Sequence, residues 1–284
     1  MTRWSNIRVA ALFLLPAVVS VVLLRLWPAA IAVHQSLLAP RASSYSLENY
    51  LYIFTDPSFL NSVWVTLLFS FIINPLQIAA ALGLAILFNN KLPMTGFWRT
   101  AVLLPVAIPQ SVSAVIWAVA YRPDGLLNSL LQLVGIGPQR FVTSPEQALG
   151  SIMLVVSWIG VGYWMTMLIA GLQDIPKSLY ESATIDGANG WHKFWYVTLP
   201  QLRRPLTFVL VADTVANFLV FAPVNILTGG GPQGSTDLIM NQIYTNAFVN
   251  GDQGSAAAAT VVLVALVLVI VLIQFRLMGD GSER

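Results

Sequence analysis

Residues 181–200 have the sequence ESATIDGANGWHKFWYVTLP, a polar segment between two long apolar runs of the chain. It is the one stretch whose composition suggests contact with another protein. Apolar residues dominate the chain as a whole: its 284 residues are 57% hydrophobic and 9% charged, and the mean hydropathy is +0.74. A soluble domain of this length carries roughly 25% charged residues. The composition therefore predicts a membrane protein.

Six apolar runs are long enough to cross a bilayer, because a membrane-spanning helix needs about 20 predominantly apolar residues. They lie near residues 9–33, 61–88, 100–121, 149–171, 205–227 and 256–277. Pro75 lies in the second run, and Pro105 and Pro109 lie in the third, so we expect these two helices to bend. The sequence predicts an all-α membrane protein with six transmembrane helices in a single domain, residues 1–284.

The distribution of Lys and Arg predicts the orientation, because these residues gather in segments that stay in the cytoplasm. If both termini are cytoplasmic, ten of the 14 Lys and Arg residues fall in cytoplasmic segments and three in outer loops, with Arg25 inside the first span. We therefore expect both termini to face the cytoplasm. The segment between the fourth and fifth spans, residues 172–204, is expected there too.

The first apolar run has a second interpretation, as a secretory signal peptide. Arg3 and Arg8 precede the run, and Ala30 and Ala32 have the spacing of a cleavage site. The run is longer than the apolar part of a usual signal peptide, which has about 7–15 residues. We expect it to be retained as a transmembrane helix.

Several kinds of site have no basis in the sequence. There is no cysteine, which excludes disulfides and thiolate metal sites. His34 and His192 fall on opposite sides of the predicted membrane and cannot share a metal ion or a proton. The glycine-rich segment 229–234 lacks the lysine of a phosphate-binding G-x-x-x-x-G-K-[ST] loop. Clustered carboxylates and basic segments typical of nucleic-acid binding are also missing, so we expect a protein that is not an enzyme and binds neither metal nor nucleic acid.

The segment 175–200 is expected to form two short helices. Pro176 suits the first turn of a helix, and Gly187 suits the left-handed residue that ends one. After the turn at 188–190, Trp191 and Phe194 begin a second amphipathic helix, which Pro200 is expected to stop.

The spacing of residues in this segment resembles the Glu-Ala-Ala loop of permease subunits in binding-protein-dependent ABC importers. The residues that carry the resemblance are Glu181-Ser182-Ala183, Asp186-Gly187-Ala188, Phe194 and Leu199-Pro200. Ser182 stands where the family usually has its second alanine. Leu227-Thr228-Gly229-Gly230-Gly231-Pro232 is similar to an outer loop of the carbohydrate branch of this family, so the resemblance extends over nearly the whole chain.

The resemblance implies a type I importer permease fold in a bacterial inner membrane. It implies as partners a second, related permease subunit, two ATPase subunits that use ATP and magnesium, and an extracytoplasmic solute-binding protein. The loop at 175–200 would then contact an ATPase subunit through Glu181, Ser182, Ala183, Asp186 and Gly187. A segment of this kind can also be an amphipathic stretch that rests on lipid head groups. Segment 229–234 is open to two interpretations, a flexible turn or a contact with the solute-binding protein.

Finer similarity points to the transported solute. The pair Trp27-Pro28, the segment 221–224 and the final apolar run are most similar to the first permease subunit of glycerol-phosphate importers. That resemblance implies a sugar, a glycerol phosphate or a glycerophosphodiester as the solute. A disaccharide, an oligosaccharide or a polyol is the alternative.

Polar residues inside the predicted spans are candidates for the solute pathway. An acid at mid-membrane costs at least about 2.5 kcal/mol, so Asp213 is expected to face a cavity, and Asn217 lies one helical turn further on the same side. The other candidates are Asn74, Gln77, Gln110, Ser111, Tyr163 and Trp164. Each neutral polar residue can instead join two helices by hydrogen bonds.

Arg25, about two turns from the outer end of the first span, is open to three interpretations. Its side chain can extend to the membrane surface, pair with Asp213, or bind a phosphate group of the solute. A self-contained secondary carrier is a further hypothesis for the whole chain, but it would have internal repeats and more buried charges than Asp213 alone. The sequence favours the importer permease.

Overall fold

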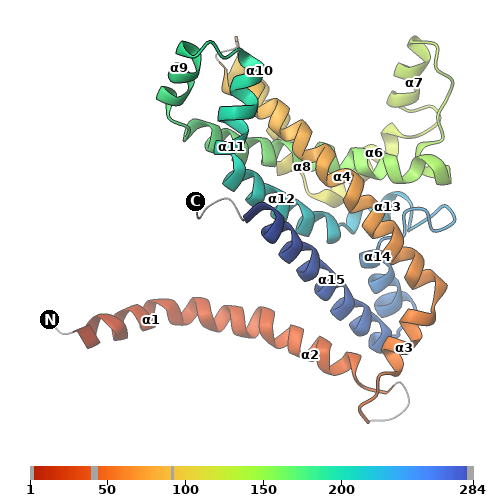
Figure 1. Ribbon diagram of the computed structural model, residues 1–284. Coiled ribbons are helices and arrows are strands. Elements are labelled where there is room, and N and C mark those ends of the chain that lie inside the picture. The colour runs from red at the N-terminus through yellow and green to blue at the C-terminus, as the bar shows by residue number, and fades with distance from the viewer. Residues whose placement is uncertain (1–2, 40–43, 91–92, 280–284) are drawn as a thin grey trace. The chain divides into compact units, whose positions relative to one another are not determined.

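The computed structural model describes residues 3–39, 44–90 and 93–279, and in these ranges nearly all regular structure is helical. A single isolated antiparallel bridge joins Leu38 to Tyr45 within them. The long helices are α1 (Arg3–Val21), α2 (Trp27–Ser36), α4 (Pro57–Asn89), α8 (Pro145–Gln173), α12 (Arg203–Phe218) and α15 (Gln253–Gly279). The shorter ones are α3 (Glu48–Thr55), α5 (Thr95–Leu103), α6 (Gln110–Ala120), α7 (Leu126–Leu133), α9 (Lys177–Ile185), α10 (Gly190–Lys193), α11 (Leu199–Gln201), α13 (Ala222–Leu227) and α14 (Ile239–Tyr244). Figure 1 shows their order along the chain.

The chain divides into two compact units. The first unit comprises Met1–Leu60 and Gln242–Ala265, and the second comprises Asn61–Asn241 and Leu266–Arg284. The second unit contains all the candidate site residues except Arg25, so it is the part that positions the site.

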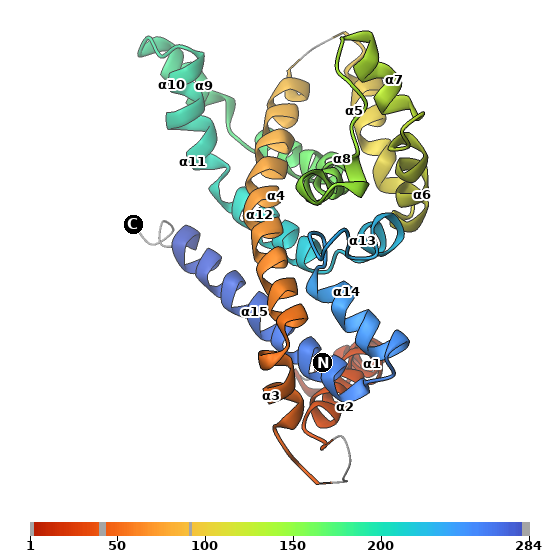
Figure 2. The same ribbon diagram turned by 90° about the vertical axis from the view of Figure 1, so that its right-hand side faces the viewer.

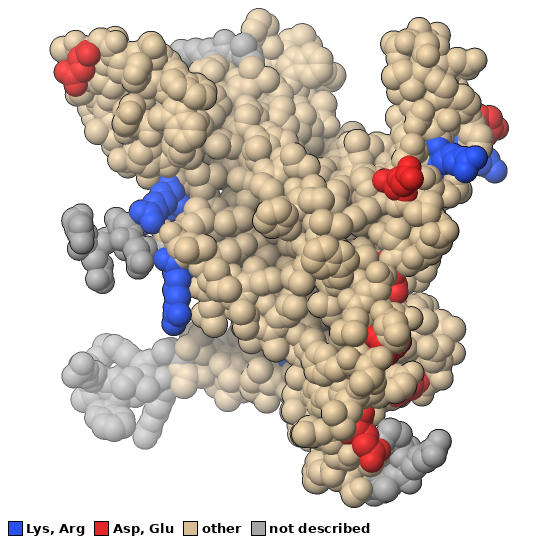
Figure 3. Space-filling view, turned by 45° about the vertical axis from the view of Figure 1, so that its right-hand side comes forward, with Lys and Arg blue, Asp and Glu red and all other residues tan. Residues whose placement is uncertain are grey.

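Five helical segments are long and apolar enough to cross a membrane, and a bent pair of helices makes a sixth if it counts as one span. The five are Ala11–Ser36, Pro57–Asn89, Pro145–Gln173, Arg203–Leu227 and Gln253–Met278, and the bent pair is Thr95–Ala107 with Gln110–Ala120. The face drawn in Figure 3 carries few charged side chains. The prediction of an all-α, multi-span membrane protein is confirmed.

Prolines act differently in the second and third spans. The bent pair turns by 103° between Ala107 and Gln110, where Pro105 lies in a 3₁₀ turn and Pro109 precedes α6. The bend predicted there is confirmed. By contrast, α4 runs unbroken through Pro75. Side chains of α4 are buried in one apolar cluster before Pro75 and in another after it, and this packing keeps the helix continuous.

Helix α8 is the centre of the second unit. It contacts α5 and α6 as well as α12 and α13, and it lies between the α5–α6 pair and α12 in Figure 2. Two glycines allow close approach. A Cβ atom on Gly162 would lie 2.2 Å from the carbonyl oxygen of Val102 in α5, and one on Gly171 would lie 2.7 Å from Pro205 Cγ in α12. These positions set the spacing of the helices that surround the candidate site.

The segment between α8 and α12 differs in detail from its prediction. Pro176 is the residue before α9 and not part of its first turn. The second helix does not stop at Pro200, because a π-helical turn, η4 (Phe194–Thr198), continues into α11. In that turn the N–H of Leu199 donates to the carbonyl oxygen of Phe194, five residues earlier. The backbone hydrogen-bond pattern of the helix has therefore already changed from four to five residues before Pro200, which has no N–H group to donate.

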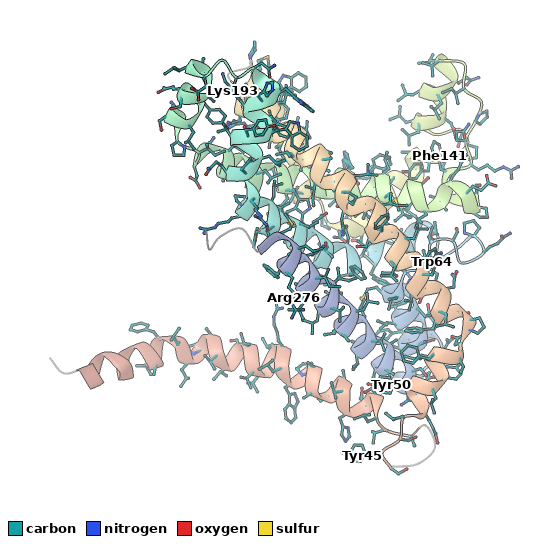
Figure 4. The ribbon with its side chains drawn as sticks, in the orientation of Figure 1. Tyr45, Tyr50, Trp64, Phe141, Lys193 and Arg276 are labelled. Carbon is teal, nitrogen blue, oxygen red and sulfur yellow. The ribbon has the colours of Figure 1, made fainter. Side chains whose placement is uncertain are left out.

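The first unit is held by buried polar contacts. Asn49 Nδ2 in α3 donates to the carbonyl oxygens of Ser36 (3.0 Å) and Leu38 (2.8 Å). Ser36 Oγ and Tyr50 Oη lie 2.8 Å apart, and Tyr50 is labelled in Figure 4. A Cβ atom on Gly254 would lie 2.7 Å from Asn49 Oδ1, so α15 begins directly against α3.

Candidate functional site

The first candidate site comprises residues 177–201, which we name the inner hairpin after the cytoplasmic side predicted for it. Helix α9 ends in a Schellman motif: the N–H of Gly187 donates to the carbonyl oxygen of Thr184 (3.1 Å) and the N–H of Ala188 to that of Ala183 (2.9 Å). Gly187 has a φ of +77°, which is strained for any residue with a Cβ atom. The left-handed conformation predicted for Gly187 is therefore confirmed.

Two further contacts shape the inner hairpin, and the sequence analysis missed both. Asn189 caps α10, because its Oδ1 accepts the N–H of His192 at 2.9 Å. An asparagine directly before a short helix is a recognisable signal for such a cap. Tyr180 Oη lies 2.9 Å from Thr198 Oγ1 and joins α9 to η4. The hairpin is thus an internally bonded unit.

The surface of the inner hairpin combines two acidic side chains with exposed apolar ones. Glu181, Ser182, Asp186 and Gly187 are exposed, and Ala183 is half-buried. Ile185 is 87% exposed, and Trp191 remains 67% exposed although its ring packs against Trp195 at 5.6 Å between centroids. Exposed apolar side chains on a polar segment are typical of a protein contact. Ile185 was not among the predicted contact residues.

The second candidate site is a polar pocket of about 70 Å³ in the second unit. Gln77 from α4, Gln110 from α6, Trp164 from α8, and Asp213 and Asn217 from α12 all line it. The structure therefore brings five of the predicted pathway residues together. Gly160 also lines the pocket and was missed; a Cβ atom there would meet Gln77 Nε2 at 3.5 Å, an ordinary contact distance.

Amide side chains connect α4 to α12 beside this pocket. Asn217 Nδ2 donates to Gln77 Oε1 (2.9 Å) and to Asn74 Oδ1 (2.7 Å). Asn74 Nδ2 in turn donates to Thr214 Oγ1 (2.9 Å), which also accepts from Gln274 Nε2 of α15 (2.8 Å). Asn74 does not line the pocket but a separate cavity of about 540 Å³, so the structure gives it the helix-joining contacts of the alternative interpretation. Thr214 and Gln274 were missed.

Asp213 has one carboxyl oxygen available. The side chain is 1% exposed, and the side chains of Trp164 and Asn217 lie next to it in the pocket. Oδ2 is buried without a hydrogen-bond partner among the described residues. No Lys or Arg is among the residues that line the pocket. An acceptor in this position suits a hydroxyl or amine donor from a bound molecule.

Three predicted pathway residues lie elsewhere. Ser111 is exposed on α6 and does not line the pocket. Tyr163 is 40% exposed, and its ring meets the edge of Trp164 at 4.8 Å between centroids. Arg25 belongs to the first unit, where its exposed side chain lies in the π-helical turn Val22–Leu26.

The glycine-rich segment 229–234 is part of a folded loop with several hydrogen bonds. Thr236 Oγ1 donates to the carbonyl oxygen of Gly231, and Asn61 Nδ2 of α4 donates to that of Gly234 at 3.0 Å. These contacts do not support the interpretation as a flexible turn. Burial raises the pKa of Asp237 in this loop, and Asn241 Nδ2 donates to its carboxyl at 2.8 Å.

The family model described as "Binding-protein-dependent transport system inner membrane component" matches residues 36–278. The chain belongs to this family, and it is a multi-pass permease subunit of an ABC importer in the inner membrane. It is a permease and not an enzyme, and it works with a solute-binding protein and the other subunits of the transporter. The resemblance in the sequence predicted this class correctly.

Individual relatives agree with this assignment. The chain is 34% identical to the sn-glycerol-3-phosphate transport system permease protein UgpA of Agrobacterium fabrum, over 94% of this chain and 93% of that protein. It is 34% identical to the trehalose/maltose transport system permease protein MalF of Thermococcus litoralis, over 78% of this chain and 75% of that protein. In fold it is similar to a chain of a bacterial ABC transporter that imports alginate, with a TM-score of 0.83 at 22% identity and 99% coverage of both chains.

Proposed function

We propose that the chain forms one half of the translocation pathway for a small, hydroxyl-rich solute and that the polar pocket is its contact with the solute. The observation that carries the proposal is the free Oδ2 of Asp213 beside Gln77, Gln110, Asn217 and Trp164. Amide and carboxyl groups bind hydroxyls, and an indole ring packs on the apolar face of a sugar. Ligand pockets usually enclose roughly 300–1,000 Å³. The partner permease is therefore expected to supply the rest of the site.

A neutral sugar or polyol is the solute that the pocket favours. The lining offers a carboxyl oxygen and no cationic side chain, so a phosphate group would find no ion pair there. The second candidate is a glycerol phosphate, because a relative at 34% identity is an sn-glycerol-3-phosphate permease. The pathway of an anionic solute would then need a cation from outside this pocket, and phosphate binding is one of the three interpretations open for Arg25.

Transport by the intact importer in liposomes tests the pocket. Uptake of neutral and phosphorylated solutes is measured with the cognate binding protein, partner permease and ATPase subunits present. Asp213→Asn is expected to lower uptake of a neutral solute by about tenfold, the size of one lost hydrogen bond. Ser111→Ala, an exposed change outside the pocket, is the matched control. Equal uptake by the two variants would show that Asp213 does not contact the solute.

We propose further that the inner hairpin couples the membrane helices to an ATPase subunit. Support comes from its exposed Glu181 and from the fixed turn at Gly187, which together present a rigid surface to a partner. This chain is expected to bind no cofactor itself, and ATP and magnesium are expected to be used by the ATPase subunits.

ATP hydrolysis by the assembled importer tests the coupling. Glu181→Ala and Gly187→Val are expected to abolish the stimulation of ATP hydrolysis by solute-loaded binding protein while the complex still assembles. Ser178→Ala, on the same exposed helix, is the control and is expected to retain stimulation. Full stimulation in both the Glu181 and the Gly187 variants would refute this coupling role.

A further inference from the structure

A large cleft of about 850 Å³ lies at one end of the second unit, apart from the polar pocket. Its walls come from the end of α8, the start of α12 and the end of α15, and none of its lining residues belongs to the pocket. In Figure 4, Lys193 and Arg276 lie toward one side of this unit, and Trp64 and Phe141 lie toward the other. The cleft is on the side of Lys193 and Arg276, which the distribution of Lys and Arg predicts to face the cytoplasm.

The mouth of the cleft is basic. Arg203 and Arg204 line it and are exposed, and neither makes a salt bridge with another described residue. One acidic side chain, Asp174, also lines the cleft. Two arginines against one aspartate leave a site that attracts an anion, and a guanidinium binds phosphate oxygens through paired hydrogen bonds.

Part of the cleft lining is apolar. Phe208, Val211 and Ala212 of α12 line it together with Phe275 and Met278 of α15. Phe208 is 58% exposed and Phe275 is 50% exposed, and both lie inside membrane-spanning helices. Arg204, Phe208 and Val211 are spaced by four and three residues, so they share one face of α12.

The basic and the apolar residues of the cleft lie at different depths of the same membrane-spanning helix. Arg203 is the first residue of the apolar segment Arg203–Leu227, so the arginines lie where this helix leaves the membrane. Val211 is about 11 Å beyond Arg204 along the helix axis, at a rise of roughly 1.5 Å per residue. The cleft therefore has a charged mouth at the membrane surface and apolar walls that run into the hydrocarbon region.

From this arrangement we infer that the cleft binds an anionic phospholipid of the cytoplasmic leaflet. The arginines bind the phosphate group, and an acyl chain lies between α12 and α15. An ATPase subunit also carries acidic side chains, but a soluble protein does not reach apolar walls roughly 11 Å inside the span. Each basic residue at the surface raises the affinity for an anionic lipid by roughly fivefold.

Lipid binding by the intact importer tests the inference. The complex is reconstituted in nanodiscs that contain phosphatidylglycerol and phosphatidylcholine in equal amounts. After transfer to mild detergent, native mass spectrometry counts the lipids that remain bound. The variant Arg203→Gln/Arg204→Gln is expected to retain phosphatidylglycerol on the order of 20-fold less well than the unchanged protein. Arg276→Gln removes a membrane-surface arginine outside the cleft and is expected to retain it fully.

A second pair of variants covers the case in which the double glutamine variant does not assemble. Arg203→Lys/Arg204→Lys keeps both charges and is expected to retain the lipid. Val211→Trp keeps both arginines but fills the apolar wall, and it is expected to lose the lipid. Retention of phosphatidylglycerol by the double glutamine variant or by Val211→Trp would overturn the inference. So would loss of the ATPase subunits with lipid retention unchanged, because the arginines would then bind protein.

Discussion

Gly162→Ala is the substitution whose effect follows most directly from the structure. The added Cβ atom would lie 2.2 Å from the carbonyl oxygen of Val102 and 2.9 Å from its carbonyl carbon. An ordinary contact begins at 3.4 Å, so α5 and α8 would have to separate by about 1.2 Å. The contacting atoms of Val102 belong to the backbone, so no side-chain rotation can relieve the contact. Overpacking of a close interface costs about 1–3 kcal/mol. We expect the upper end of that range for Gly162→Ala.

The assay is the apparent unfolding temperature of the purified importer in detergent, followed by size-exclusion chromatography after heating. A loss of about 3 kcal/mol lowers this temperature by roughly 6–12 °C. The control is Gly150→Ala in the same helix, where a Cβ atom meets nothing within 4 Å. Uptake is also expected to fall in Gly162→Ala, because Trp164 of the pocket is two residues further along α8. If the two variants unfold at the same temperature, the close approach of α5 and α8 is wrong.

Three other substitutions test local features. Tyr180→Phe removes the hydrogen bond to Thr198 and is expected to lower the stability of the inner hairpin by about 1 kcal/mol. Amide hydrogen exchange in the hairpin should become faster, and unchanged exchange would contradict the contact. Ser113→Ala removes a buried hydroxyl that has no hydrogen-bond partner among the described residues, so it is expected to stabilise the protein by about 1 kcal/mol. Thermal unfolding measures this change, and a loss of stability would contradict it. Burial raises the pKa of Asp237 above 3.8, so the folded state binds its proton more tightly and stability falls as the pH rises through the raised pKa. Asp237→Asn keeps an acceptor for Asn241 and is expected to be more stable than the unchanged protein at pH 8 but not at pH 4, whereas parallel stability curves would exclude this effect.

The inner hairpin was predicted well because its structure depends on nearby residues. The left-handed turn at Gly187 requires only a residue without a Cβ atom and hydrogen bonds to residues three and five positions earlier. A turn that depends only on neighbouring residues can be predicted from a short stretch of sequence. The continuation of the helix through Pro200 was missed, because a π-helical turn changes which N–H groups are needed.

The polar pocket was predicted only in part. Hydropathy and the cost of a buried acid identified Asp213 and Asn217, but the same argument included Ser111 and Tyr163, which do not line the pocket. Gly160 was not predicted, because a glycine gives no polar signal. Asn74 was predicted as a pathway residue, and its contacts with Asn217 and Thr214 became visible only when α4 and α12 were placed together.

The sequence by itself determined the class of the protein, its apolar spans and the turn of the inner hairpin. Each of these depends on composition or on residues close together in the chain, since a span needs only length and apolarity. The tertiary structure decided which polar side chains share a pocket, where Gly162 lets two backbones touch, and that Arg203 and Phe275 border one cleft. These features depend on the rotation and spacing of helices far apart in the sequence, and packing of whole surfaces sets both.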